Sequence, residues 1–453
     1  MASERRVDRF FAALARLVLH IFFRRVEVLG AERVPAEGPL LVVANHLNGL
    51  VDPLFLLGTL RLPVRFLGKS TLWKIPVLGA LLRLAGAIPV HRRQDAGVDP
   101  ERNLETFARC HELLAAGGMI ALFPEGISHD APALQPLKTG TARIALEAEQ
   151  RFGPLGVRIL PVGLTFSDKT RFRSRALVVV GEPLDLTVER AAAGEDPVGT
   201  ARGLTARIDE ALRRVTLNYD TWEEARLVER AAGLFDREPS SLPTGRPLAE
   251  TFEMQRALLA GSESLAHRYP ERLAALAAAV ADYDRLLRVA RVRDEHVAAA
   301  YPLGEVAAFV AGSLATMVVR LPIALVGVLA NLLPYQLARL AAAFVRESPD
   351  QISTYKVYPS LILYPATWIA EAVALGYAAG PLAGLTALVL APLCGWVALR
   401  TLEDQLRLAR ESRVFLLLHT RRGLWNALRG RREAIRRELE ALADEIAGSG
   451  RDA

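Results

Sequence analysis

The first half of the chain alternates between short apolar runs and longer stretches in which apolar residues recur every three or four positions. Short uninterrupted runs are typical of buried strands, and the longer spacing is typical of amphipathic helices. This alternation predicts an α/β domain. The predicted strands are Val26–Leu29, Leu40–Ala44, Val64–Leu67, Ala87–Val90, Met119–Phe123, Ile159–Leu164 and Ala176–Val180. The predicted helices between them are Leu54–Leu60, Val77–Ala85, Glu101–Ala116 and Thr139–Arg151.

The pattern becomes entirely helical after Thr200. A stretch rich in Pro, Ser and Gly, residues 237–247, predicts a linker, so the α/β domain is expected to cover residues 25–236. Residues 248–301 predict a helical connector, with an interruption at Pro270.

Residues 302–400 contain two apolar stretches that are long enough to cross a bilayer. The first is Val306–Leu333, and the second, Val357–Leu399, is interrupted by Gly380-Pro381 and is long enough for two crossings. Aromatic residues gather at the start of the second stretch, as they do at membrane interfaces. We predict transmembrane helices, with a buried helical bundle as the alternative because Ala and Gly are abundant.

Both ends of the chain are predicted to lie against a membrane surface. Residues 1–24 combine basic side chains with an apolar run that is short for a span, which favours an interfacial amphipathic helix. Residues 401–453 form a basic amphipathic tail, which is expected on the cytoplasmic face. If the tail and the α/β domain share that face, the number of crossings is even: two hairpin-like pairs, or two crossings plus buried helices.

Composition narrows the range of partners. The net charge is +6, 51% of the residues are hydrophobic, and the mean hydropathy is +0.20. A basic chain suits anionic lipid, a phosphorylated substrate or nucleic acid, but no RNA-binding pattern of interleaved aromatics is present, so we expect no nucleic-acid partner. The two cysteines, Cys110 and Cys394, support neither a disulfide framework nor a Cys-based metal site, which fits a reducing cytoplasm.

The first candidate for chemistry directly follows the strand Leu40–Ala44. Asn45-His46 is followed by Asn48-Gly49 and then by Asp52-Pro53. On a continuous helix, side chains six positions apart would point about 120° from one another. Asn and Gly favour a turn, however, which can fold Asp52 back onto His46 so that the carboxylate orients the imidazole as a general base. The structural alternative is a helix-capping Asp52 beside an incidental His46.

The second candidate follows the strand that begins at Met119. Its sequence is Phe-Pro-Glu-Gly-Ile-Ser-His-Asp, residues 123–130, and Lys138 precedes the next helix. Lys138 offers a charge, while Gly126, Ser128 and the helix N-terminus offer donors, a combination that suits phosphate. His129 and Asp130 either bind the acceptor or cap the turn. A basic cluster further on either attracts phosphates or forms a solvated loop: Lys169, Arg171, Arg173 and Arg175.

Four motifs resemble, in order, those of the glycerolipid (phospholipid/glycerol) acyltransferases. One departure is that five residues separate His46 from Asp52, where most of the family has four. The Ser-His-Asp after Glu125-Gly126 and the Leu-Lys-x-Gly around Lys138 are similar to fungal-type glycerol-3-phosphate/dihydroxyacetone-phosphate acyltransferases and their bacterial relatives. The four motifs are Asn45-His46 with Asp52, the stretch from Gly86 to Arg92, Phe123-Pro124-Glu125-Gly126-Ile127-Ser128, and the apolar stretch Ile159–Leu164.

The resemblance implies a mixed, mostly parallel sheet with helices on both faces, followed by a helical connector and membrane helices. It implies that an acyl group passes from acyl-CoA or acyl carrier protein to the 1-hydroxyl of glycerol 3-phosphate or dihydroxyacetone phosphate. His46 would remove the hydroxyl proton while Asp52 orients the ring, with no metal or bound cofactor, on the cytoplasmic side of a bilayer. The implied substrate-binding residues are Asn45, Lys69, Arg92, Glu125, Gly126, Ser128, His129 and Lys138.

Two alternatives share these motifs. A 1-acyl-glycerol-3-phosphate (lysophospholipid) acyltransferase would use nearly the same chemistry on a different acceptor. A non-catalytic lipid-binding or scaffold protein would keep the fold without the reaction. Acyl transfer by the wild type and by His46→Ala separates the enzymes from the scaffold.

Overall fold

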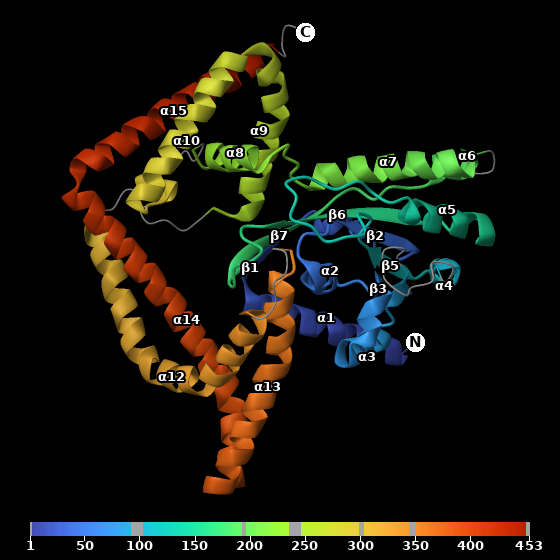
Figure 1. Cartoon of the computed structure of the whole chain (residues 1–453), viewed down its shortest axis with the longest axis horizontal. Helices are drawn as coiled ribbons and strands as arrows, with labels where there is room; N and C mark the ends of the chain where they lie inside the picture. Colours follow the sequence, from blue (N-terminus) through green and yellow to red (C-terminus); the bar gives the residue numbers. More distant parts are fainter. Residues whose placement is uncertain are drawn as a thin grey trace. The chain divides into compact units, whose positions relative to one another are not determined.

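The computed structural model describes residues 2–91, 103–192, 196–234, 246–298, 303–343 and 350–449 (Figure 1). Contacts divide the chain into two compact units. The first unit contains Met1–Asp220 and, from much later in the sequence, Arg346–Val357; the second contains Thr221–Val345 and Tyr358–Ala453. Arg92 and most of the predicted linker, residues 237–245, lie outside the described residues.

A seven-stranded sheet forms the centre of the first unit, and it includes all seven predicted strands. The five strands from β6 to β4 run parallel, while β7 is antiparallel to β6 and parallel to β1. The expected mixed, mostly parallel sheet is therefore confirmed. In order across the sheet, the strands are β1 (Phe23–Leu29), β7 (Ser174–Val180), β6 (Arg158–Phe166), β2 (Leu40–Ala44), β5 (Met119–Leu122), β3 (Val64–Lys69) and β4 (Ile88–Val90).

Helices cover both faces of this sheet. In Figure 1, α5 and α7 lie on one face, and α1, α2 and α3 lie on the other. The strands β2 and β5 are buried along their whole length, which explains why their sequences are continuously apolar rather than alternating. The helices of this unit are α1 (Ala2–Phe22), α2 (Asp52–Leu60), α3 (Pro76–Leu84), α4 (Asn103–Ala115), α5 (Gly140–Phe152), α6 (Thr187–Ala192) and α7 (Pro197–Val215). Short 3-10 turns are η1 (Ala31–Arg33), η2 (Gly49–Val51) and η3 (Ser70–Lys74).

The N-terminal helix α1 has the amphipathic character expected of residues 1–24. It packs against α2, and Ala15, Val18 and Leu19 are buried. Phe10 and Leu17 remain exposed. One side of the helix therefore belongs to the protein core, and exposed apolar side chains are left for an interface.

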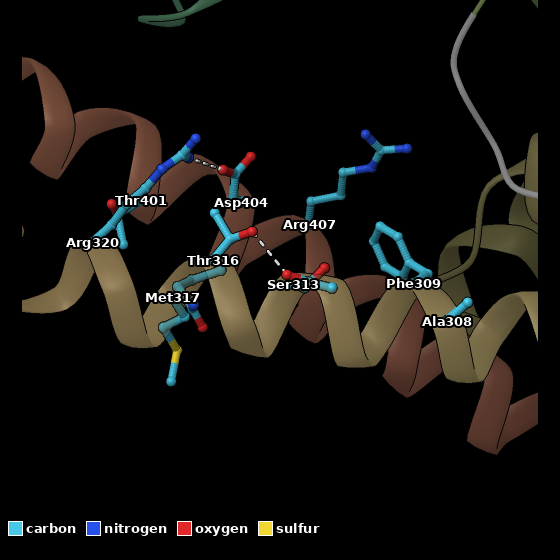
Figure 2. A pocket seen from close by; sticks show the side chains of 11 residues that line it. Ala308, Phe309, Ser313, Thr316, Met317, Arg320, Thr401, Asp404 and Arg407 are labelled. Atoms are coloured by element: carbon cyan, nitrogen blue, oxygen red, sulfur yellow. Dashed lines mark hydrogen bonds and ion pairs between the residues drawn. The ribbon is translucent and has the colours of Figure 1, made fainter.

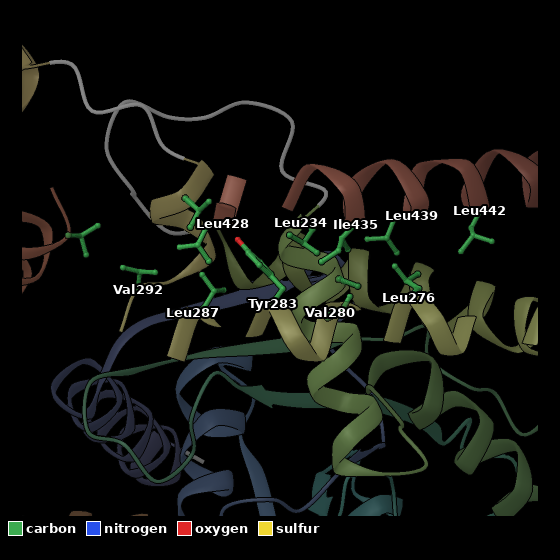
Figure 3. Close-up of a cluster of buried hydrophobic side chains, with 13 residues drawn as sticks. Leu234, Leu276, Val280, Tyr283, Leu287, Val292, Leu428, Ile435, Leu439 and Leu442 are labelled. Carbon is green, nitrogen blue, oxygen red and sulfur yellow. The ribbon is translucent and has the colours of Figure 1, made fainter. Parts of the chain in front are cut away.

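The second unit contains a helical cluster, and its buried side chains are shown in Figure 3. Tyr283 lies at its centre, where its hydroxyl donates to Asp294 over 2.7 Å, and the guanidinium of Arg432 binds the same carboxylate. The predicted interruption at Pro270 is confirmed, since a new helix begins there. The helices that contribute are α8 (Trp222–Leu234), α9 (Leu248–Arg268), α10 (Pro270–Ala290), α11 (Asp294–Ala298), the end of α14 (Pro381–Thr420) and α15 (Arg422–Ser449).

The C-terminal helix α15 has its apolar side covered by protein. The sequence predicts that residues 401–453 form a basic amphipathic tail against a membrane surface, and α15 is basic and amphipathic. Its apolar residues Leu428, Ile435, Leu439 and Leu442 are nevertheless buried in the helical cluster. A sequence pattern identifies an apolar stripe on a helix but not what covers it, and here protein covers it.

Among the residues that the structure describes, three helices are long and apolar enough to cross a membrane: α12 (Leu303–Ala343), α13 (Ile352–Ala379) and α14 (Pro381–Thr420). Many of their large apolar side chains are exposed, as expected for helices surrounded by lipid. The break predicted at Gly380-Pro381 separates α13 from α14. Membrane association follows from these helices, whereas the even number of crossings stays a prediction.

Small residues and one polar side chain hold these three helices together. A Cβ on Gly384 of α14 would lie 2.5 Å from the carbonyl oxygen of Ala372 in α13, so the two backbones approach closely. Asn331 of α12 donates to the carbonyl of Ala391 over 3.1 Å and accepts from the indole of Trp368 over 3.0 Å. The side-chain amide of Asn331, in otherwise apolar surroundings, thus forms hydrogen bonds with both neighbouring helices.

Candidate active site

The two motifs singled out in the sequence meet at one edge of the sheet. Because β2 and β5 are parallel neighbours in register, the loops that follow them leave the sheet side by side. The backbone N–H of His46 donates to Glu125 Oε1 over 2.7 Å, and the N–H of His129 donates to the carbonyl of His46 over 3.1 Å. Residues about eighty positions apart therefore form one site.

His46 and Asp52 are in contact. The Nδ1 atom of His46 lies 2.9 Å from Asp52 Oδ2, which also accepts the backbone N–H of Asn48 over 2.8 Å. Asp52 is fully buried at the start of α2. The intervening residues form the turn η2, in which Gly49 has a φ of +50°, a conformation that glycine adopts readily. This turn accommodates the extra residue between the pair.

The contact sets the proton arrangement of His46. Since Asp52 accepts a hydrogen bond from Nδ1, the neutral ring carries its lone pair on Nε2. The ring stacks on Phe123 with centroids 4.1 Å apart and an interplanar angle of 11°, and 15% of the side chain is exposed. The geometry therefore fits a general base whose reactive nitrogen is oriented by a buried carboxylate.

Glu125 connects the two loops. Its Oε1 accepts the N–H of His46, and its Oε2 accepts the N–H of Gln135 over 2.7 Å and the Nε2–H of His129. The ring of His129 also accepts the N–H of Ala131 at Nδ1, so both nitrogens have protein partners. The Glu125 side chain is completely buried, so Glu125 and His129 are placed to hold the loops together.

Asn45, Lys138 and Lys69 are further residues that the sequence predicts at the site. Asn45 is buried and exchanges two hydrogen bonds with the backbone of Leu164, at 2.7 and 3.0 Å, which ties the site to β6. Lys138 is exposed and lies against Gly126, where an added Cβ would be 2.6 Å from Nζ. Lys69 ends β3 at the same edge of the sheet. Of the described cations, Lys138 is thus the best placed beside the Glu125–Gly126 loop to meet an anionic group.

Lys169 and Arg173 of the basic cluster contact other parts of the protein. Lys169 Nζ donates to the carbonyls of Leu47 and His129, over 2.9 and 3.0 Å, and pairs with Asp130 at 2.8 Å. Arg173 donates to carbonyls at the end of α1, including that of His20. Lys169 therefore joins the loop that contains His46 to the loop that contains Glu125. This role differs from both predicted alternatives, a solvated basic loop and a phosphate site.

Sequence reasoning missed the segment that leads into α13. Residues 350–357 belong to the first unit, and Asp350 accepts a hydrogen bond from the hydroxyl of Ser128. Thr354 Oγ1 accepts the N–H of Leu50 over 3.1 Å and would lie 2.7 Å from a Cβ at Gly49. This segment thus contacts both loops of the site. Its polar residues resemble an ordinary helix start, so no local pattern could have revealed the contact.

Within the part of the chain that the structure describes, no group of three or more His, Cys, Asp or Glu side chains is placed to hold a metal ion.

Two family models match different parts of the chain. Residues 25–165 match the family described as Acyltransferase. The chain contains an acyltransferase domain. Residues 230–449 match the family described as Glycerol-3-phosphate acyltransferase 2 C-terminal domain, so the helical half that follows the acyltransferase domain is also found in relatives.

Several named proteins are similar in sequence to this chain. An uncharacterized acyltransferase of Schizosaccharomyces pombe is 27% identical over 62% of this chain and 54% of its own. Glycerol-3-phosphate O-acyltransferase 1 of Saccharomyces cerevisiae is 26% identical over 60% of this chain and 46% of its own. The chain therefore spans about half the length of these relatives. The 1-acyl-sn-glycerol-3-phosphate acyltransferase BAT2 of Brassica napus is 28% identical over 37% of this chain and 44% of its own.

One solved structure is similar to part of the chain. The 1-acyl-sn-glycerophosphate acyltransferase of Thermotoga maritima covers 47% of this chain and 78% of its own, with 22% identity and a TM-score of 0.35.

Proposed function

We propose that this protein is a membrane-bound O-acyltransferase that moves a fatty acyl group from a thioester to the 1-hydroxyl of glycerol 3-phosphate or dihydroxyacetone phosphate. The observation that carries the proposal is the 2.9 Å contact between His46 and Asp52 at the sheet edge. Exposed Lys138, beside Gly126, supplies a cation for the acceptor phosphate.

The choice of acceptor rests on the second half of the chain. The C-terminal family match covers residues 230–449, and its description names glycerol 3-phosphate. Relatives named for 1-acyl-glycerol 3-phosphate cover a smaller share of this chain, 37% for the Brassica napus protein against 60% for the yeast protein. These two observations favour the small acceptor over the lysophospholipid.

The proposed reaction is a direct acyl transfer. Nε2 of His46 takes the proton of the acceptor hydroxyl while its oxygen attacks the thioester carbonyl, and Asp52 stabilises the imidazolium that forms. Collapse of the tetrahedral intermediate breaks the C–S bond and forms the ester, and the leaving thiolate recovers the proton from the imidazolium. The thioester of acyl-CoA or acyl carrier protein supplies the activation, so the scheme requires no metal.

The same proposal places the site on the cytoplasmic face. Helix α13 starts with residues that belong to the first unit, and α14 follows it directly after Gly380, so these two helices form a pair that crosses and returns. Helix α12 contains Pro322 and Pro334 and is bent in Figure 1, which suits a helix that enters and leaves the membrane on one side. This arrangement gives two crossings.

Cysteine labelling tests the two-crossing arrangement. A cysteine introduced at Gly380 should react only with an impermeant reagent added from outside, and one introduced at Ala447 should react only from the cytoplasmic side. Reaction of both positions from the same side would contradict two crossings.

Acceptor choice tests the function. The purified full-length protein should be given one acyl-CoA with glycerol 3-phosphate, dihydroxyacetone phosphate or 1-acyl-glycerol 3-phosphate. We expect the largest kcat/KM with one of the first two. A preference for 1-acyl-glycerol 3-phosphate would overturn the acceptor, and no transfer with any of them, from acyl-CoA or acyl carrier protein, would favour a non-catalytic lipid-binding protein.

A further inference from the structure

A cavity of about 430 Å³, lined by both polar and apolar side chains, lies between α12 and α14. Arg320 and Asp404 lie at one end of it and Arg407 and Phe309 at the other, with Ser313 and Thr316 between them (Figure 2). All of these residues belong to the second unit, so this cavity is separate from the acyltransferase site. Its lining combines charged, hydroxyl and apolar side chains.

The position of the cavity along α14 corresponds to the edge of a bilayer. The apolar part of α14, Pro381–Leu399, spans about 28 Å at about 1.5 Å per residue, close to the thickness of the hydrocarbon core. Charged residues begin at Arg400, and the cavity residues Asp404 and Arg407 follow within two turns. A ligand in the cavity would therefore lie at the depth of phospholipid headgroups.

The charges of the cavity favour an anion. The lining contains two guanidinium groups, those of Arg320 and Arg407, and one carboxylate, that of Asp404. Arg320 Nη1 lies 2.9 Å from Asp404 Oδ2, but the two side chains are 42% and 59% exposed, so this pair is of the weak, solvent-screened kind. Arg407 is held over the ring of Phe309, 5.6 Å from its centroid. Two guanidinium groups at such a site are well suited to the oxygens of a phosphate.

The surrounding surface suits acyl chains. Leu325 and Val326 of α12 follow the cavity residue Arg320 toward the part of the helix that lies beside the apolar segment of α14, and they are 56% and 55% exposed. If the phosphate of a lipid lies in the cavity, the hydrocarbon chains of that lipid can contact these exposed apolar side chains on α12.

We propose that this cavity binds the phosphate of an anionic phospholipid. Arg320 and Arg407 would hold the phosphate oxygens, and the acyl chains would extend along α12. The site does not depend on the acyl-transfer proposal, because none of its residues takes part in that reaction.

Lipid retention tests the proposal. The purified full-length protein should be titrated with dioleoyl phosphatidate, dioleoyl phosphatidylglycerol and dioleoyl phosphatidylcholine, and bound lipids counted by native mass spectrometry. We expect one anionic lipid to be retained over phosphatidylcholine. The double variant Arg320→Gln/Arg407→Gln should bind it at least about tenfold more weakly. Equal retention of all three lipids by the wild type would overturn the proposal.

A matched control is available on the same helix. Arg400 pairs with Glu403 and stacks on Trp396 and does not line the cavity, so Arg400→Gln should retain the lipid as the wild type does. An equal loss in Arg400→Gln and in the double variant would show only general surface charge and would overturn the site.

A second variant keeps the test valid if the arginine variants fold poorly. Asp404→Asn leaves both cations in place and removes the carboxylate that competes for Arg320, so it should retain the anionic lipid more tightly than the wild type. Weaker or unchanged retention would contradict the proposal. Inorganic phosphate should compete only weakly, because it lacks the acyl chains; competition as strong as that of the lipid would assign the cavity to free phosphate instead.

Discussion

Asp52 reaches the imidazole of His46 across five intervening residues, with 2.9 Å between Oδ2 and Nδ1. The turn η2 absorbs these residues, and the left-handed conformation of Gly49 permits it. The carboxylate is fully buried and also accepts the N–H of Asn48, so its position is fixed from two directions. An orienting carboxylate of this kind is the feature that makes a histidine an effective base.

Replacement of Asp52 by Asn should remove most of the activity without unfolding the protein. The amide is nearly the same size, but it no longer stabilises an imidazolium at Nδ1 of His46. We expect kcat to fall by about 10²–10⁴-fold, with a small change in the KM for the acceptor. Steady-state kinetics check this, and circular dichroism controls for folding. A kcat equal to that of the wild type would show that the contact has no catalytic role.

Glu125→Gln should destabilise the site. The carboxylate accepts three hydrogen bonds, and an amide presents an NH₂ group to at least one of these donors. One unsatisfied buried donor costs about 1–3 kcal/mol of unfolding free energy. Thermal unfolding of the solubilised protein measures the change, with Glu182→Gln as the control because the Glu182 side chain is 76% exposed. Equal unfolding midpoints for both variants would argue against the proposed connection between the loops.

Thr354→Val should lower activity although it lies more than 300 residues from His46 in sequence. Valine has the same shape but cannot accept the N–H of Leu50, which follows His46 in the loop that contains η2. We expect a loss of kcat/KM of about fivefold to a hundredfold, equivalent to roughly 1–3 kcal/mol. Thr367→Val on the same helix is the matched control, since the Thr367 hydroxyl bonds only within α13 among the contacts described. Equal activities would show that residues 350–357 do not order the site.

His111 should contribute to acid sensitivity. Burial lowers the pKa of His111 below its ordinary value of 6.5, against the opposing effect of Glu147. The unfolded chain therefore binds a proton more readily than the folded one, so stability falls as the pH drops through about 6.5 and is fully present above it. Between pH 7.5 and 5.5, the unfolding midpoint of His111→Gln should fall by less than that of the wild type. Equal losses would exclude this contribution.

The strands and the central pair of the site could be predicted because both depend on local sequence. Runs such as Leu40–Ala44 are buried on both faces of a parallel sheet, and their composition shows it. Asn48 and Gly49 signal the turn that returns Asp52 to His46. In each case the determining residues are neighbours along the chain.

Other features could not be predicted because they depend on distant parts of the chain. The hydrogen bond between Ser128 and Asp350 joins residues 222 positions apart. The apolar stripe of α15 was visible in the sequence, but its burial in the helical cluster was not. From the sequence, the carboxylate of Glu125 could bind either substrate or backbone N–H groups. Only the fold shows that backbone N–H groups donate to both of its oxygens.

Acyl transfer by His46→Ala tests the central claim most directly. The rate of transfer from acyl-CoA to glycerol 3-phosphate should be measured for the purified wild type, for His46→Ala and for His419→Ala, which is exposed on α14 in the second unit. We expect a loss of about 10²–10⁴-fold or more in His46→Ala and a rate close to wild type in His419→Ala. A wild-type rate in His46→Ala would contradict the central claim.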